Sequence, residues 1–119
     1  MPITMHHEGD NLFRLDVRGS LRKADLERNQ KDLLVHMARV GPVKLLFVLQ
    51  YFEGWHSGDN WSDLSFYITH GDSIQRIAIV GEERWRSELL MFAGADLRQA
   101  AVQFFPAPGL ADARVWLAA

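Results

Sequence analysis

The five consecutive apolar residues from Leu45 to Leu49 constrain the fold more strongly than any other stretch of the chain. An apolar run of this length is typical of a β-strand that is buried on both faces. The strand runs out through Phe52 and Gly54, and Trp55 and Trp61 then bracket the start of a predicted helix. Open α/β sheets bind ligands where a parallel strand ends and the next helix begins. The stretch therefore predicts an α/β sheet with a candidate binding site at its carboxyl edge.

Strand and helix signals alternate along the rest of the chain. Continuous or period-two apolar patterns predict strands over residues 3–9, 11–17, 45–49 with an extension through 54, 74–80 and 100–105. Patterns near 3.6 residues per turn predict helices over residues 23–39, 59–70, 82–93 and 108–117. The order β-β-α-β-α-β-α-β-α predicts a single α/β domain over residues 1–119, with a mostly parallel five-stranded sheet and about four helices. A turn at Gly9–Asn11 makes the opening pair an antiparallel hairpin at or near one edge.

The first predicted helix has an ordinary amphipathic pattern. Its apolar positions follow a spacing close to 3.6 residues and should face the sheet. The residues of this predicted buried face are Leu26, Leu33, Leu34, Met37 and Val40.

The predicted helix over residues 82–93 is apolar around most of its circumference, at Trp85 and from Leu89 to Phe92. Such a helix needs a partner besides the sheet, either a ligand, a second subunit or a neighbouring helix. Gly81 and Gly94 flank it and would tolerate the dihedral changes of a hinge. We expect either a mobile lid that opens an apolar cleft or a fixed helix at a dimer interface.

Composition narrows the functional classes. The 119 residues carry a net charge of -2 and include no cysteine. The charge balance gives no attraction to nucleic acid or an anionic membrane, and the lack of cysteine excludes disulfides and a thiol nucleophile. No apolar run approaches the roughly 20 residues of a membrane helix, and the first residues lack a signal-peptide pattern. We expect a soluble cytoplasmic protein with no nucleic-acid partner, no integral membrane segment, no metal and no cofactor.

Several short motifs resemble those of a known family. Together with the element order, FEGW at residues 52–55, WSDL at 61–64, RIAIVG at 76–81 and the following Trp85 resemble the SpoIIAA-like family of small bacterial proteins. The likeness extends from the turn at residues 19–21 to Trp116. The resemblance implies the STAS-type fold of anti-sigma-factor antagonists and sulfate-transporter tails. It also implies a non-enzymatic protein that carries an apolar or amphipathic ligand.

The phosphorylation motif of the better-known antagonists is only partly retained. Those proteins have an Asp-Ser-Ser-Gly turn after the central strand, in which a serine is phosphorylated. This chain has Trp55, His56, Ser57 and Gly58 at that place, so the aspartate and the first serine are replaced. Ser57 at a predicted helix N-terminus would still suit a phosphate.

The aromatic residues near the end of the central strand have two interpretations. They supply burial area in a small core, or they line a ligand pocket in which His56 and Ser57 orient the polar end of the ligand. The residues predicted for the pocket are Phe52, Trp55, His56, Ser57, Trp61, Phe66, Trp85, Leu89 and Phe92.

Three functions are compatible with these patterns. The first is a carrier or binding module for a lipid-like small molecule, favoured by the aromatic residues and the apolar helix. The second is a protein-interaction regulator of the anti-sigma-antagonist type, switched by phosphorylation at Ser57. The third is an enzyme that uses His56 with Glu53 or Asp59. We expect no catalytic residues, because the chain has no phosphate loop and no HExxH motif, and adjacent His and Ser side chains rarely align.

A homodimer is also expected, because two-fold dimers are the commonest oligomers. The predicted interface combines the helix over residues 82–93 with the strand residues Phe104 and Phe105.

Overall fold

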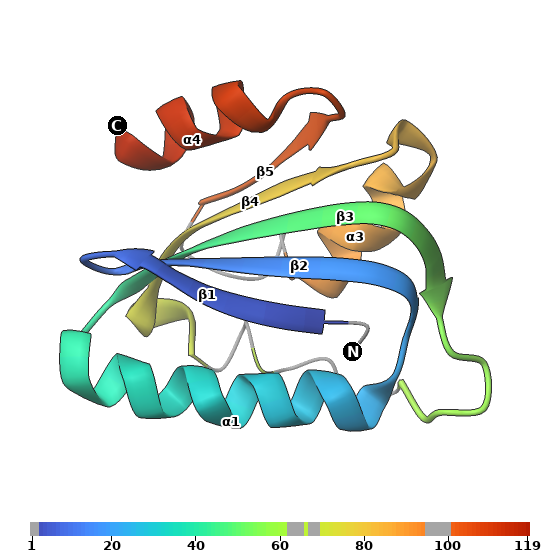
Figure 1. Ribbon diagram of the computed structural model, residues 1–119, viewed down its shortest axis with the longest axis horizontal. Helices are drawn as coiled ribbons and strands as arrows, with labels where there is room; N and C mark the ends of the chain where they lie inside the picture. The colour runs from blue at the N-terminus through green and yellow to red at the C-terminus, as the bar shows by residue number, and fades with distance from the viewer. Residues whose placement is uncertain (1–2, 62–65, 67–69, 95–100) are drawn as a thin grey trace.

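Five strands form one sheet in the computed structural model, in the order β1 (Ile3–Gly9), β2 (Leu12–Leu21), β3 (Val43–Trp55), β4 (Ile74–Gly81) and β5 (Ala101–Pro106) (Figure 1). The structure describes residues 3–61, 66, 70–94 and 101–119. β1 pairs with β2 in the antiparallel sense, and every other neighbouring pair is parallel. The predicted edge hairpin and the mostly parallel sheet are confirmed.

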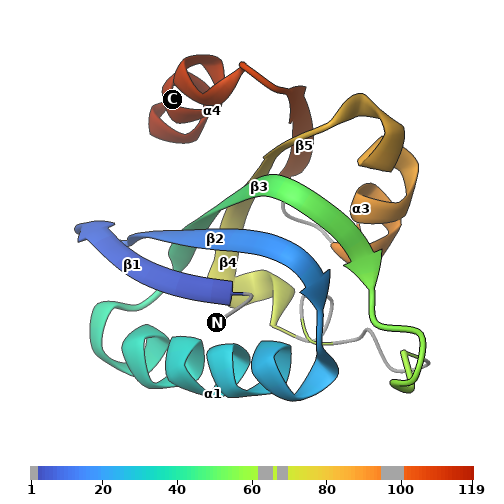
Figure 2. The ribbon, with the colours of Figure 1, turned by 45° about the vertical axis from the view of Figure 1, so that its right-hand side comes forward.

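The sheet is covered on both faces by helices (Figures 1 and 2). α1 (Lys23–Val40) and α3 (Arg86–Phe92) lie on one face, and α4 (Leu110–Ala118) lies on the other. Of the helices in the described residues, none is long and apolar enough to span a membrane. The predicted helix over residues 59–70 lies largely outside the described residues, which contain three α-helices rather than the four expected.

The segment predicted as a helix over residues 82–93 consists of two elements. A 3₁₀ turn, η2 (Glu83–Trp85), is followed by the seven-residue helix α3. Another 3₁₀ turn, η1 (Gly71–Ser73), precedes β4. The α-helical part of the segment predicted as a lid is therefore shorter than its apolar pattern indicates, because residues 83–85 form the tighter 3₁₀ turn.

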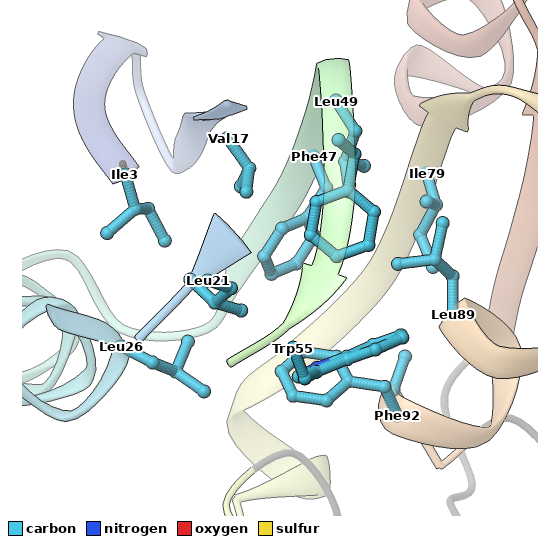
Figure 3. A pocket seen from close by; sticks show the side chains of 12 residues that line it. Ile3, Val17, Leu21, Leu26, Phe47, Leu49, Trp55, Ile79, Leu89 and Phe92 are labelled. Atoms are coloured by element: carbon cyan, nitrogen blue, oxygen red, sulfur yellow. The ribbon is translucent and has the colours of Figure 1, made fainter. Parts of the chain in front are cut away.

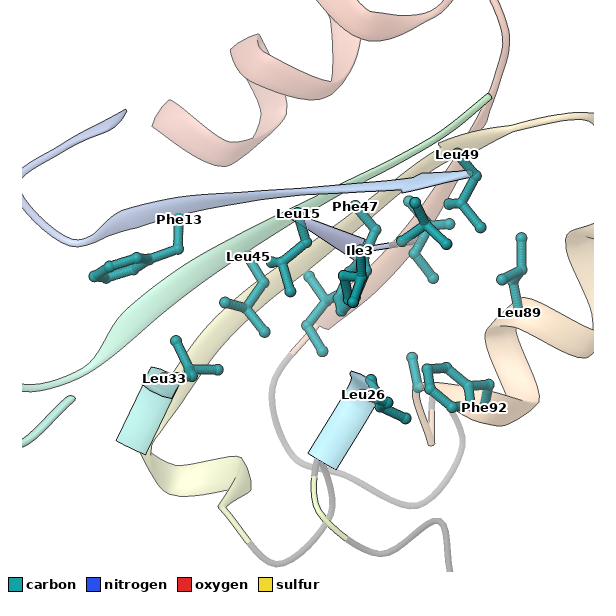
Figure 4. Packing of buried hydrophobic residues seen from close by; sticks show 14 of the residues in the cluster. Ile3, Phe13, Leu15, Leu26, Leu33, Leu45, Phe47, Leu49, Leu89 and Phe92 are labelled. Atoms are coloured by element: carbon teal, nitrogen blue, oxygen red, sulfur yellow. The ribbon is translucent and has the colours of Figure 1, made fainter. Parts of the chain in front are cut away.

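Alternation along the central strands divides the buried residues into two cores. Leu45 and Leu49 point toward α1 and α3, whereas Leu46 points toward α4. Leu26 and Leu33 of α1 point into the core that contains Leu45 and Leu49 (Figure 4). Because both faces are covered, the central strand can be apolar without interruption, as its sequence predicted.

The buried face of α1 differs in part from the prediction. Leu34 and Val40 are exposed, while Asn29 is buried. Leu34 lies about 100° around the helix from Leu33, so only one of the two can face the sheet. The stripe that faces the sheet is instead Leu26, Asn29, Leu33 and Met37.

Two basic side chains hold the C-terminal end of α4 against the sheet. The Lys44 ammonium donates to the carbonyl oxygen of Leu117 at 2.5 Å, and the Arg76 guanidinium donates to that of Trp116. Arg76 also stacks over the Trp116 ring, 5.0 Å from its centroid. Cations at a helix C-terminus satisfy its free carbonyl groups and complement its dipole. α4 is thereby fixed over β3 and β4.

Candidate functional site

The site is shaped by two irregular steps at the end of β3. The pairing of β3 with β2 shifts at Tyr51 and again at Glu53, so each is an extra residue opposite β2. Tyr51 has a φ of 55°, a left-handed conformation that is uncommon for a residue with a side chain. Bulges of this kind bend a strand, and the end of β3 curves strongly toward the face that carries α1 and α3 (Figure 1).

The extra residue at Tyr51 also reverses which face the following side chains occupy. Simple alternation would place Phe52 on the face of Leu46, beneath α4. With the bulge, Phe52 lies in the other core and is 2% exposed. Trp55, opposite Leu21 of β2, packs against that same core. The bulge at Tyr51 therefore moves Phe52 into this core, and the second bulge, at Glu53, keeps Trp55 on the same face.

Four aromatic rings meet at this end of the sheet. Phe52 packs edge-on against Trp55 and Trp85, with centroid distances of 5.3 Å and 5.1 Å. Trp55 contacts Trp85 at 6.2 Å and Phe92 at 5.6 Å. Edge-to-face contacts of this kind stabilise aromatic pairs beyond their burial. We call Phe52, Trp55, Trp85 and Phe92 the aromatic cluster.

Behind the aromatic cluster lies a small enclosed cavity, the inner cavity, with a volume of about 20 Å³. Figure 3 shows the rings of Trp55 and Phe92 beside each other at one side of this space. The remaining walls come from the β-strands, α1 and α3, and all of the lining residues are apolar. They include Ile3, Val17, Leu21, Leu26, Leu49 and Leu89.

On the outer side of the same two rings is an open groove of about 250 Å³, the outer groove. Its lining residues are Trp55, Trp61, Glu88, Met91 and Phe92. The Trp61 ring is held in place because its indole N–H donates to the His56 carbonyl oxygen at 2.8 Å. Met91 is 75% exposed, so the groove offers apolar surface to the solvent.

Trp55 and Phe92 line both spaces. Their contact is therefore the wall between the inner cavity and the outer groove. Trp55 belongs to β3 and is fixed by the sheet, whereas Phe92 is the last residue of the short helix α3. A displacement of Phe92 would join the two spaces.

The loop after β3 has a structural role that the sequence did not reveal. Asp59 Oδ2 accepts the backbone N–H of Lys23 at 2.8 Å and lies 3.6 Å from Arg22 Nε. Lys23 is the first residue of α1, so Asp59 caps this helix from a distant part of the chain. The Lys23 N–H, assisted by the charges of Arg22 and His56, lowers the pKa of the Asp59 carboxyl, although desolvation opposes this. Asp59 was predicted to begin the helix over residues 59–70 or to serve a catalytic histidine.

This cap predicts an acid-sensitive contribution to stability. Because the pKa of Asp59 is lower in the folded chain, its carboxylate stabilises the fold above the unfolded value of about 4 and ceases to do so as the pH falls through the folded value. We expect Asp59→Asn to lower Tm by a few degrees at pH 6 and to have a smaller effect at pH 3. Circular-dichroism melting curves at both pH values measure this difference. The control is Glu27→Gln, which replaces an exposed side chain of α1 and should show no pH-dependent loss of Tm.

The structure brings together most of the predicted pocket residues. Phe52, Trp55, Leu89 and Phe92 line the inner cavity, and Trp61 joins two of them in the outer groove. Three of the others, His56, Ser57 and Phe66, line neither space. Phe66 packs against the same core as Trp55 and contacts His70 with a centroid distance of 4.7 Å.

Trp85 supports the site from behind. It lines neither the inner cavity nor the outer groove, but its ring packs on the backbone of Gly54. Glu88 and Met91 line the outer groove and were not among the predicted pocket residues, although Met91 belongs to the apolar run predicted for the lid. The period-two pattern of β2 could have indicated Val17, which faces the same core as Leu49.

Comparisons with known proteins agree on the type of fold. Residues 12–118 match the family model described as SpoIIAA-like. The structure is similar to the crystal structure of an uncharacterized protein of the DUF3478 family with a SpoIIAA-like fold, from Shewanella loihica PV-4. That match has 21% sequence identity and a TM-score of 0.72, and it covers 97% of this chain and 91% of the other. No curated protein sequence matches the chain.

Proposed function

The chain belongs to the SpoIIAA-like family, and we propose that it is a non-enzymatic module that binds a small apolar or amphipathic molecule between β3 and α3. The observation that carries this proposal is the wall formed by Trp55 and Phe92. The same two rings line an open apolar groove and an enclosed apolar cavity. A ligand that rests in the outer groove could extend its apolar end into the inner cavity once Phe92 moves.

The volumes limit the kind of ligand. Pockets for drug-sized ligands usually measure about 300–1,000 Å³. The outer groove, at about 250 Å³, is slightly smaller, and the inner cavity of about 20 Å³ holds no more than a water-sized group. With Phe92 in place, a long lipid chain does not fit in the inner cavity. We therefore favour a short-chain molecule, or a longer one that requires α3 to move.

A pair of surface variants tests this site. Met91→Glu should weaken the binding of methyl octanoate by about tenfold or more, because it removes apolar contact and adds a charge to the outer groove. Val115→Glu is the matched control. Val115 is also exposed on a helix, at 72%, and also lies three residues after an acidic residue, Asp112. Titration of tryptophan fluorescence measures the Kd of each protein.

The wild type and the Val115→Glu variant should bind alike. Absence of binding by the wild type, or equal weakening by both variants, would contradict a specific site at the outer groove. Extraction of the purified protein followed by mass spectrometry would identify any molecule that it already carries.

A second candidate function is a protein-interaction regulator of the anti-sigma-antagonist type. It is supported by the exposed side chain of Ser57 in the turn that follows β3, a place accessible to a kinase. Ser57→Ala should abolish phosphate incorporation by an extract of the source cells if this candidate is correct. Equal labelling of both proteins, or no labelling of either, would remove it.

Self-association stays a prediction, but the predicted interface needs correction. Phe104 is buried in the chain's own core, and Phe105 packs against Trp116 of α4 with a centroid distance of 6.0 Å. Phe104 is therefore not available to a second copy, and Phe105 is half-buried. The apolar residue of α3 that is exposed is Met91. The idea that this helix acts as a mobile lid also stays a prediction, to be measured by amide hydrogen exchange at residues 89–93.

A further inference from the structure

The aromatic cluster contains two polar atoms with no apparent partner. The indole nitrogens of Trp55 and Trp85 are buried, and within the described part of the chain neither donates a hydrogen bond. The indole N–H of Trp61, by contrast, donates to the His56 carbonyl. Buried polar groups in folded proteins are nearly always paired, so each exception requires an explanation. An indole N–H is only a donor, so the missing partner must be an acceptor.

The two tryptophans differ in their position relative to the site. Trp55 lines both the inner cavity and the outer groove. Trp85 lines neither and packs between Phe52 and the backbone of Gly54. Only the Trp55 N–H is therefore placed on a ring that a ligand would touch.

We propose that the indole N–H of Trp55 donates to a carbonyl oxygen of the ligand, and that the ligand is an uncharged apolar ester, ketone or amide. This inference rests on the proposed function. It adds a polar recognition element to a site whose inner walls are apolar. An alkane of the same length would leave the N–H unpaired.

Water is a poor alternative partner for this N–H. Buried waters in proteins usually make about three hydrogen bonds, and apolar cavities stay dry. The residues that line the inner cavity are apolar, so a water within that cavity would have few other polar groups to bind. A carbonyl oxygen attached to an apolar body needs only the one donor.

The charges around the outer groove disfavour a carboxylate ligand. Glu88 is the only charged residue among the described residues that line the groove. The nearby arginines already have acidic partners: Arg84 lies 3.4 Å from Glu82, and Arg86 lies 2.7 Å from Glu83. A fatty acid would therefore meet the like charge of Glu88, and neither of these two arginines is unpaired to offset it. This is why the proposal specifies an uncharged ligand.

The test compares methyl octanoate, octane and octanoate on ¹⁵N-labelled protein. Each of the four tryptophans gives one indole N–H signal in an NMR spectrum. We expect the ester to bind about 3–10-fold more tightly than octane, which corresponds to one neutral hydrogen bond. The ester should also bind more tightly than octanoate. The Trp55 indole proton should shift downfield with the ester and not with octane.

Two matched variants isolate the donor. Trp55→Phe keeps an aromatic ring but removes the N–H, and it should abolish the preference for the ester over octane. Trp85→Phe removes an equally buried and unpaired N–H outside the site, and it should retain the preference. The downfield shift in the wild type tests the proposal independently of whether either variant folds.

The outcomes separate the inference from the proposed function. Equal binding of ester and octane without a Trp55 shift would overturn the inference and leave the binding site intact. Tighter binding of octanoate than of the ester would overturn the requirement for an uncharged ligand. Failure of all three probes to bind would overturn both the inference and the proposed function.

Discussion

Replacing Phe52 with alanine is expected to lower the free energy of unfolding by about 3–5 kcal/mol. Phe52 is 2% exposed and is the central ring of the aromatic cluster, in edge-on contact with Trp55 and Trp85. Its removal would leave a cavity between β3 and the segment that leads into α3. Because native domains are stable by only about 5–15 kcal/mol, this loss should be visible as a large decrease in the urea midpoint.

The neighbouring residue supplies the control for Phe52. Tyr51 is 78% exposed, and its ring lies beneath the Arg18 guanidinium at 5.4 Å. We expect Tyr51→Ala to change stability by less than about 1 kcal/mol, since exposed cation–π contacts contribute little. If Phe52→Ala and Tyr51→Ala lowered the free energy of unfolding equally, the buried position of Phe52 after the bulge would be wrong.

Replacing Gly54 with alanine is expected to cost about 2–4 kcal/mol, for two separate reasons. The φ of Gly54 is 93°, which L-residues rarely adopt. A Cβ atom there would also lie 3.1 Å from Cη2 of Trp85. The Trp85 ring rests directly on this backbone, so the added methyl group would push it away from Phe52. Urea unfolding monitored by tryptophan fluorescence measures the loss.

Gly41→Ala separates the effect of backbone strain from that of the steric conflict with Trp85. Gly41 has a φ of 79°, but a Cβ atom there would meet nothing within 4 Å. This variant should show the backbone strain without the steric conflict, and it should therefore be clearly less destabilised than Gly54→Ala. Equal losses in the two variants would mean that Trp85 adjusts without cost and that its contact with Gly54 is unimportant.

The central strand and its two cores could be predicted from the sequence because their pattern is local. The apolar run from Leu45 to Leu49 requires cover on both faces, and the helices provide it. The hairpin turn and the order of strands and helices were likewise encoded in short-range signals. The same signals, with the family motifs, placed the aromatic residues at the carboxyl end of β3.

Features that depend on distant contacts could not be predicted in this way. The bulge at Tyr51 occurs without a glycine, so nothing in the local pattern indicates that Phe52 changes faces. Asp59 caps α1 across 36 positions of the chain, and only the folded structure reveals this contact. The roles of Met91 and Glu88 were missed for a similar reason, because the groove is formed by separate elements.

The central claim is that Trp55 and Phe92 separate the outer groove from the inner cavity and that a ligand passes between them. Intermolecular NOEs between methyl octanoate and a protein labelled at its leucine and methionine methyl groups test it most directly. We predict NOEs from the ester's methoxy group to Met91 and from the end of its chain to Leu26 or Leu49, which line the inner cavity. NOEs confined to Met91, or seen instead to Leu117 on the other face of the sheet, would contradict the claim.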